Sequence, residues 1–155
     1  MRLIICFLGL ALSLPAQFSS KVDTFGMVGV ANGQTVRLNV LNMGLQSTEP
    51  PTCLISLLFL NDQGEVLKTK TVDVRPTHST YLDLDADTDL LLAANERRQI
   101  RGLIIPLSAD PGGMGAACPL LPTLELFDRS TGKTSLILTK TQVIPRAPLL
   151  ERNRD

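Results

Sequence analysis

Residues 53–64, CLISLLFLNDQG, join an apolar run to a turn signal, and the rest of the chain is arranged around them. In an extended strand alternate side chains share a face, and one face here is wholly apolar: Cys53, Ile55, Leu57 and Phe59. The opposite face holds three leucines and one serine: Leu54, Ser56, Leu58 and Leu60. A strand that is apolar on both faces is expected at the centre of a sheet, with its second side covered. Residues 61–64 predict a tight hairpin loop that ends in glycine.

Shorter alternating segments predict the other strands of an all-β domain. They cover residues 25–30 (an edge strand), 35–42, 65–75, 79–85, 99–107, 118–127 and 134–141. In the strand over 99–107, the apolar residues Leu103, Ile105 and Leu107 have one parity. The strand over 65–75 changes the phase of its alternation, which predicts a bulge or a break near Lys70 and allows a strand that begins on one sheet and finishes on the other.

Residues 87–98, DTDLLLAANERR, differ in character from these strands. They are rich in helix-forming residues, Asp87 or Thr88 can serve as an N-cap, and two arginines close the segment. The pattern predicts one or two helical turns that cross between the sheets.

The N-terminus has the pattern of an export signal. Arg2 supplies a positive charge, residues 3–14 are apolar, and Pro15 then ends the run. The alternative, a membrane anchor, requires about 20 apolar residues. We expect cleavage after Ala16, which removes residues 1–16 and leaves a domain over residues 17–144 with a polar tail over 145–155. No membrane span is expected after cleavage.

Signal cleavage would remove Cys6 and leave two cysteines, Cys53 and Cys118. Two cysteines in an exported chain predict one disulfide, whereas the alternative is a pair of buried free thiols. The strand over 118–127 carries Cys118 on the same side as Leu126, which suits a bridge between two sheets. The bridge would close a loop of about 65 residues, for which the chain-entropy model predicts roughly 4 kcal/mol of stabilisation.

Charge and aromatic content exclude several classes of partner. Lysine plus arginine equals aspartate plus glutamate at 15 each, so the formal net charge is zero. A nucleic-acid-binding protein needs a basic surface, and an anionic membrane attracts polybasic segments. There is no tryptophan, and only one tyrosine and five phenylalanines are present. Aromatic platforms for stacking bases or sugars are therefore poorly supplied.

One cluster could bind a metal ion, because alternating carboxylates supply the hard oxygen ligands that Ca²⁺ prefers. The ladder consists of Asp83, Asp85, Asp87 and Asp89. Leu90 stands where a calcium-binding loop of the EF-hand type needs glycine. The alternative interpretation is that the first two aspartates line the solvated face of a strand, and the last two cap a helical turn. Apart from this calcium site, no cofactor is expected.

His78 is the single histidine, and it lies in a predicted turn over residues 76–80. A catalytic triad needs a nucleophile and an orienting carboxylate that converge on the histidine. The chain has no G-x-S-x-G or H-E-x-x-H motif. We therefore expect a non-enzymatic protein, with a small secreted hydrolase as the less favoured alternative.

The short strands, the cross-linking cysteine pair and the helical crossing together resemble an immunoglobulin-like or fibronectin-III-like β-sandwich over about residues 24–144. The resemblance is to small stand-alone sandwiches of secreted bacterial proteins, and it implies a Greek-key arrangement of about seven to eight strands. Such a domain is expected in the periplasm or outside the cell. It would act as a structural, adhesive or protein-interaction module that binds a protein or cell-surface partner. Loops 43–52 and 111–117 are the candidate contact surfaces, because loops on rigid sandwiches commonly bind. The alternative function is a calcium-dependent binding module.

Overall fold

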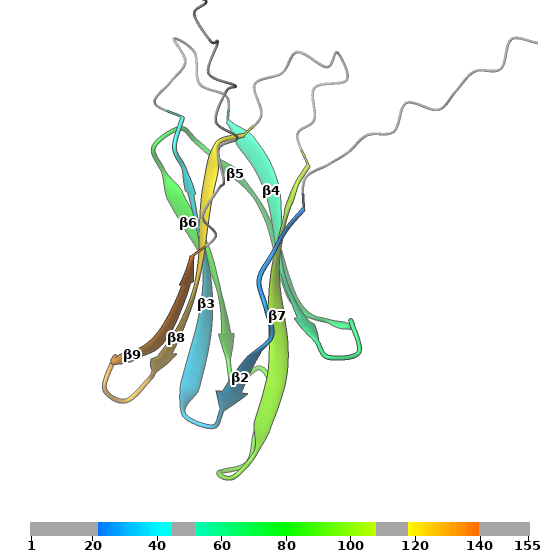
Figure 1. The fold of residues 1–155 in the computed structure, drawn as a ribbon, viewed down its shortest axis with the longest axis vertical. Coiled ribbons are helices and arrows are strands. Elements are labelled where there is room, and N and C mark those ends of the chain that lie inside the picture. Colours follow the sequence, from blue (N-terminus) through cyan, green and yellow to red (C-terminus); the bar gives the residue numbers. More distant parts are fainter. Residues whose placement is uncertain (1–21, 45–51, 108–117, 140–155) are drawn as a thin grey trace, which may run out of the picture.

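The structure, a computed structural model, describes residues 22–44, 52–107 and 118–139 (Figure 1). The predicted signal peptide over 1–16, the cleavage site after Ala16 and the tail over 145–155 lie outside these ranges. Most of the loop at 43–52 and all of the loop at 111–117 lie outside them as well.

All regular elements of the described residues are β-strands, so the predicted all-β fold class is confirmed. The strands are β1 (Asp23–Thr24), β2 (Val28–Ala31), β3 (Gln34–Asn42), β4 (Cys53–Asn61), β5 (Val66–Val74), β6 (Ser79–Asp85), β7 (Arg97–Pro106), β8 (Leu120–Asp128) and β9 (Thr134–Thr139).

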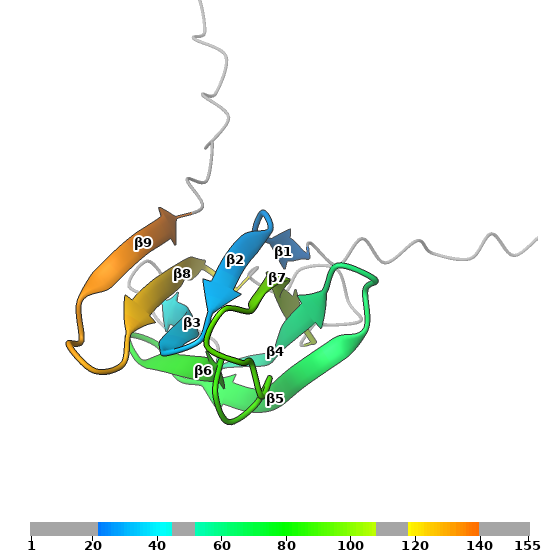
Figure 2. The ribbon, with the colours of Figure 1, turned by 90° about the horizontal axis from the view of Figure 1, so that it is seen from below.

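The strands form two antiparallel sheets that face each other (Figure 2). Sheet A has the order β1-β7-β4-β5, and β2 also pairs with β7. Sheet B has the order β6-β3-β8-β9. The central strands are therefore β4 and β7 in sheet A, and β3 and β8 in sheet B. The apolar core lies between the two layers and draws on the inner faces of both.

Strand β4 is central in sheet A, as its apolar pattern predicts, since β5 pairs with one side of it and β7 with the other. Its inward side chains are fully buried: Cys53, Ile55, Leu57 and Phe59. Its second face was expected to be covered as well. In the described part of the chain, however, no third layer lies over sheet A: Leu60 is buried, but Leu54 and Leu58 are only half-buried.

The prediction for the strand over 65–75 is wrong in two respects. β5 pairs with β4 along its length and does not cross to sheet B, and the bulge falls at Leu67 instead of near Lys70. The bulge turns Leu67 toward the core, whereas Lys68 and Lys70 have the inward parity of Phe59 and Leu57. Lysine tolerates this position at a sheet edge because its apolar stem packs while its ammonium group reaches polar partners.

The predicted helical crossing over residues 87–98 is also wrong: the segment forms turns, and Arg97 and Arg98 begin β7. One turn closes where the N–H of Asp89 donates to the carbonyl of Asp85 at 3.0 Å. The core then buries both Leu90 and Leu92 and leaves Leu91 exposed. Residues two apart lie on different sides of a helix, so a helix could not turn both Leu90 and Leu92 toward the core. Leu91 instead adopts a left-handed φ of 54°, which ends the turn.

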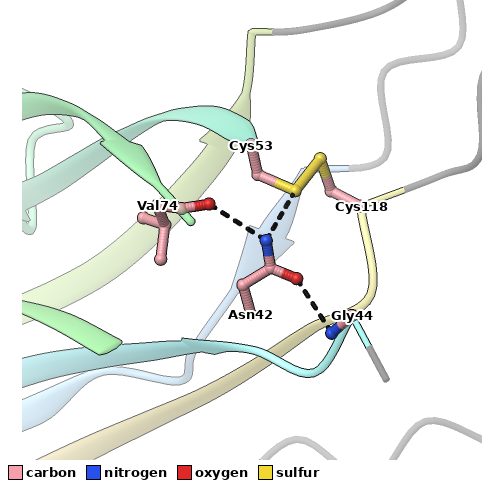
Figure 3. The surroundings of a disulfide bond; sticks show 5 residues. All are labelled: Asn42, Gly44, Cys53, Val74 and Cys118. Atoms are coloured by element: carbon pink, nitrogen blue, oxygen red, sulfur yellow. Dashed lines mark hydrogen bonds between the residues drawn. A yellow bond between two sulfur atoms is a disulfide. The ribbon is translucent and has the colours of Figure 1, made fainter. Parts of the chain in front are cut away.

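The predicted disulfide between Cys53 and Cys118 is confirmed, with the two Cα atoms 5.9 Å apart (Figure 3). It joins the first residue of β4 in sheet A to the segment that leads into β8 in sheet B. Buried Asn42 lies beside it at the end of β3. The Asn42 Nδ2 group donates to the carbonyl of Val74 at 3.0 Å and to Cys53 Sγ at 3.5 Å, and Oδ1 accepts from the N–H of Gly44 at 3.1 Å. The bridge and this amide together fasten the two sheets at one end.

Gly102 allows the two sheets to approach closely in the middle of the sandwich. It has the inward parity of β7, between fully buried Ile100 and Ile104. A Cβ atom at this position would lie 2.9 Å from Leu124 Cδ1 and 3.3 Å from Leu38 Cδ1 of the opposite sheet. Because core side chains are close-packed, a side chain at 102 would require Leu124 and Leu38 to shift or β7 to move away from the opposite sheet.

We expect Gly102→Ala to lower the free energy of unfolding by about 1–2 kcal/mol, as overpacked cores do. The matched control is Gly26→Ala, because no atom lies within 4 Å of a Cβ built there. This control should be neutral or slightly stabilising, since alanine restricts the unfolded chain. Urea unfolding of both variants measures the difference, and equal stabilities would contradict close sheet packing at Gly102.

Candidate functional site

The outer two aspartates of the predicted ladder form ion pairs with basic side chains. Asp83, on the outer face of β6, accepts two hydrogen bonds from the guanidinium of Arg37, each at 2.7 Å. Asp89 accepts from Lys68 Nζ at 2.6 Å. The Asp83 pair raises the pKa of Arg37, mainly through the side-chain hydrogen bond. Both carboxylates thus neutralise cations of neighbouring strands.

The inner two aspartates organise the turn that follows β6. Asp85 Oδ1 accepts from the N–H groups of Asp87 and Thr88, both at 2.9 Å, and from Arg129 at 2.9 Å. Asp87 Oδ1 accepts from the N–H of Gly33 at 2.7 Å. Burial acts to raise the pKa of Asp85, but the hydrogen bonds from Thr88 and Asp87 outweigh it and lower the pKa. The aspartates therefore hold together the β2–β3 turn, the β6 turn and the β8–β9 hairpin.

Calcium binding by Asp83, Asp85, Asp87 and Asp89 stays a prediction. Among the described residues, no group of three or more histidine, cysteine, aspartate or glutamate side chains is arranged to hold a metal ion. Glu96, the twelfth residue when a calcium-binding loop of the EF-hand type is counted from Asp85, instead accepts from the N–H of Ala93 at 2.8 Å. The geometry favours the interpretation of these carboxylates as strand partners and turn caps.

His78 lies in an exposed turn between β5 and β6. Its Nδ1 atom is 2.9 Å from the carbonyl oxygen of Pro76 in the same turn. An open cavity of about 270 Å³ adjoins the ring and is lined by Val72, Asp73, Val74, Arg75, His78, Ser79 and Thr80. Among the described residues, the His78 ring bonds to neither a hydroxyl nor a carboxylate, so they form no triad around it.

The outer face of sheet B is mostly polar around Arg37 and its partners, although Leu41, Leu121 and Ile137 also lie on this face. The Arg37 guanidinium lies over the ring of Tyr81 at 4.3 Å and near that of Phe127 at 5.3 Å, while it also binds Asp83. Asn39 and Thr123 continue this face. An antiparallel sheet with one face in water shows this inward-apolar, outward-polar alternation.

The outer face of sheet A breaks that rule. We name as the apolar face five outward side chains of β4 and β7 and the residue after β7: Leu54, Leu58, Leu103, Ile105 and Leu107. Leu58 lies directly opposite Leu103, Ser56 opposite Ile105, and the N–H of Leu107 donates to the carbonyl of Leu54 at 2.8 Å. Four of these side chains are partly exposed and Leu107 is 47% exposed. The apolar face is the candidate functional site of the described residues.

Sequence reasoning did not identify this site, although the signal was present. The common parity of Leu103, Ile105 and Leu107 was noted, and in the structure this parity faces outward. Gly102 at an inward position breaks the apolar series that would otherwise mark the true core side of β7. The pattern predicts a covered second face of β4, and Leu60 is indeed buried, whereas Leu54 and Leu58 form one surface with the β7 residues.

No family model matches this chain, and comparisons with curated proteins and with solved structures return no match either. The resemblance to immunoglobulin-like sandwiches therefore stays a prediction. The described residues contain no helix long and apolar enough to span a membrane.

Asp85→Ala is expected to lower the free energy of unfolding at pH 7 by about 2 kcal/mol, because it removes a turn cap and a charged hydrogen-bond acceptor. The pKa of Asp85 is lowered in the folded state. Its contribution is therefore present above the unfolded pKa of about 4 and is lost as the pH falls through the folded value.

The stability difference between wild type and Asp85→Ala should accordingly shrink below about pH 4. Denaturant titrations across this range measure it. Asp73→Ala, on exposed β5, is the control and should change little at any pH. A difference that is constant with pH would contradict the role of the charged carboxylate.

Proposed function

We propose that this protein is an exported, non-enzymatic β-sandwich that acts by binding another protein through the apolar face. The observation that carries the proposal is the breach of alternation on β4 and β7, where leucine and isoleucine face outward. Contiguous exposed apolar surface on a soluble domain commonly marks an interaction site. The sandwich fold accounts for only one apolar face of each sheet, so the second face on sheet A needs another explanation.

The chemistry of the apolar face favours a protein surface as its partner. The chain has no net charge for a nucleic acid or an anionic lipid headgroup. The described aromatic residues lie elsewhere: Phe25 and Phe59 in the core, and Tyr81 and Phe127 with the outer face of sheet B. A flat aliphatic surface with Arg101 and Asp73 on neighbouring rows has the apolar centre and polar rim of a protein interface. Burying the exposed part of each side chain would contribute about 1 kcal/mol.

The immunoglobulin-like, Greek-key type of the sandwich is part of this proposal. β7 lies beside β4, β4 lies beside β5, and Lys70 Nζ of β5 donates to the carbonyl of Tyr81 in β6 at 2.9 Å. With β6 counted next to β5 across the two sheets, the order β7-β4-β5-β6 matches the 4-1-2-3 order of a Greek key, which supports this type. The proposed location, secreted or periplasmic, is supported by the disulfide, which persists in oxidising compartments.

Intact-mass measurement of the purified, exported protein tests the location. We expect the loss of about sixteen residues and no alkylation of cysteine before reduction, because the signal is removed and Cys53 is bridged to Cys118. A full-length chain with alkylatable thiols at these two positions would contradict export through an oxidising compartment.

Site-specific photo-crosslinking in the producing cell tests the apolar face. A photoreactive phenylalanine analogue replaces Leu58 in one variant and Asn39 in the other. Both positions are outward on central strands, but Asn39 lies on the polar face of sheet B. We expect one discrete heterologous protein adduct from position 58 and none from position 39. The identified partner should then bind Leu58→Lys at least tenfold more weakly than Asn39→Lys.

Three outcomes would overturn the proposal. The crosslink from position 58 could form within the same chain, which would mean that the chain covers its own face. It could join two copies of the chain, which would make the face a self-association surface. Equal yields of the same adduct from positions 58 and 39 would show that capture is not specific to the apolar face.

A further inference from the structure

The four outer edges of the two sheets differ in how they are protected. An edge strand has unpaired N–H and C=O groups that can pair with another chain. Proteins block such pairing with short strands, bulges or inward-pointing charged residues. In the described residues, the edges are β5 and the β1–β2 side in sheet A, and β6 and β9 in sheet B.

Three of these edges carry an identifiable protection. β5 has a bulge at Leu67 and two inward lysines, of which Lys68 binds Asp89. Lys70 crosses to β6, where it donates to Thr80 Oγ1 at 3.1 Å and to the carbonyl of Tyr81 at 2.9 Å, so it also occupies the β6 edge. The third edge is split into two short strands, β1 with 2 residues and β2 with 4.

β9 lacks such protection beyond the end that adjoins the β8–β9 hairpin. Its sequence, TSLILT, has no charge and no proline, and β8 is the only described strand that pairs with it. Figure 2 shows β9 at the outer end of its layer. Ile137 is 60% exposed, and Leu136 and Leu138 on the inner side are only half-buried. The single irregularity is a register shift next to the hairpin, opposite Leu126 and Phe127.

The sequence of β9 is nearly the same in both directions about Ile137. Reversal exchanges Leu136 with Leu138 and Ser135 with Thr139. A two-fold interface brings the same surface of both subunits together, so it requires a surface that complements itself. In an antiparallel pair centred on Ile137, apolar residues would face apolar residues and small hydroxyl residues would face each other. No charge within the strand opposes its own copy.

We propose that two copies of this chain pair through β9, antiparallel and with the two-fold axis at Ile137. Sheet B then continues from one copy into the other as a single eight-stranded sheet. Leu136 of each copy lies opposite Leu138 of the other, and the half-exposed inner side of β9 gains a cross-strand partner. This surface is separate from the apolar face, so either proposal can fail without the other.

Cysteine placement on the oxidised, exported chain tests the pairing and its register. Directly opposite residues in an antiparallel pair have Cβ atoms about 5 Å apart, so Ile137→Cys should form a covalent dimer under mild oxidation. Thr139 would lie opposite Ser135 of the second copy and about 13 Å from its own equivalent. Thr139→Cys is therefore the control and should stay uncrosslinked. Peptide mapping confirms that Cys53 and Cys118 remain joined.

Sedimentation velocity over a range of concentrations provides the second readout. We expect a wild-type dimer that Ile137→Lys weakens at least tenfold, because two ammonium groups then meet at the axis. Val66→Lys, also an exposed apolar residue of an edge strand, should leave the dimer unchanged. A wild type that stays monomeric up to millimolar concentration would overturn the proposal, and so would equal crosslinking of the two cysteine variants. A third result would also overturn the proposal: wild type and Ile137→Lys both stay monomeric and bind a separate extended peptide equally well.

Discussion

The packing of β4 and β7 against β3 and β8 is the interaction on which the rest of this structure depends. Phe59 and Ile104 fill the inner layer, and Gly102 leaves room for Leu38 and Leu124 from the opposite sheet. Each strand has two faces, and a two-layer sandwich buries only one of them. Because β4 and the end of β7 carry leucine and isoleucine on both faces, the packing that makes the core also leaves an aliphatic surface in water. The proposed function follows from this constraint.

Two polar clusters lie at opposite ends of β3, and the first of them ties the two layers together. At one end, Asn42 links β3 to the carbonyl of Val74 and to the Cys53–Cys118 bridge. At the other end, the Asp85 carboxylate accepts a hydrogen bond from the Thr35 hydroxyl. It also accepts from a backbone N–H of the turn after β6 and from Arg129 of the β8–β9 hairpin. Buried or half-buried polar groups of this kind are costly when unpaired. The first cluster therefore selects one alignment of the sheets and the second fixes the turns of sheet B, while the apolar middle supplies the driving force.

Local alternation predicted most of the fold because a half-buried strand imposes a period of two on its own sequence. It located β3, β4, β6 and β8 and the inward side of Cys118, and the compartment argument predicted its bridge to Cys53. It did not predict the direction of β7, since an inward glycine is indistinguishable by pattern from a polar break. It also could not show that Lys68 and Lys70 point inward, because their partners are distant in sequence. The helix prediction used propensity alone, whereas tertiary burial of Leu90 and Leu92 decided the turn.

The candidate site could not be assembled from the sequence alone, although its separate strands carry a signal. The outward leucines of each strand can be found along the chain. They form one surface only because β4 and β7 pair in the register that places Leu58 opposite Leu103. Sequence reasoning therefore directed attention to loops and to the aspartate ladder, where local motifs are visible. The Asp83–Asp89 ladder proved to lie within reach of Arg37, Lys68 and Arg129, which only the fold brings near.

The central claim is that the apolar face serves binding and is not part of the folded core. Urea unfolding of the double variant Leu58→Thr, Leu103→Thr tests it most directly, because threonine keeps the strand propensity of these positions. We predict a loss of less than about 1 kcal/mol in the free energy of unfolding for the pair, as expected for surface positions. The inward variant Leu57→Thr, made for comparison, should lose about 2–5 kcal/mol. A loss of core size from the outward pair would contradict the account, because it would mean that the chain buries this face against itself.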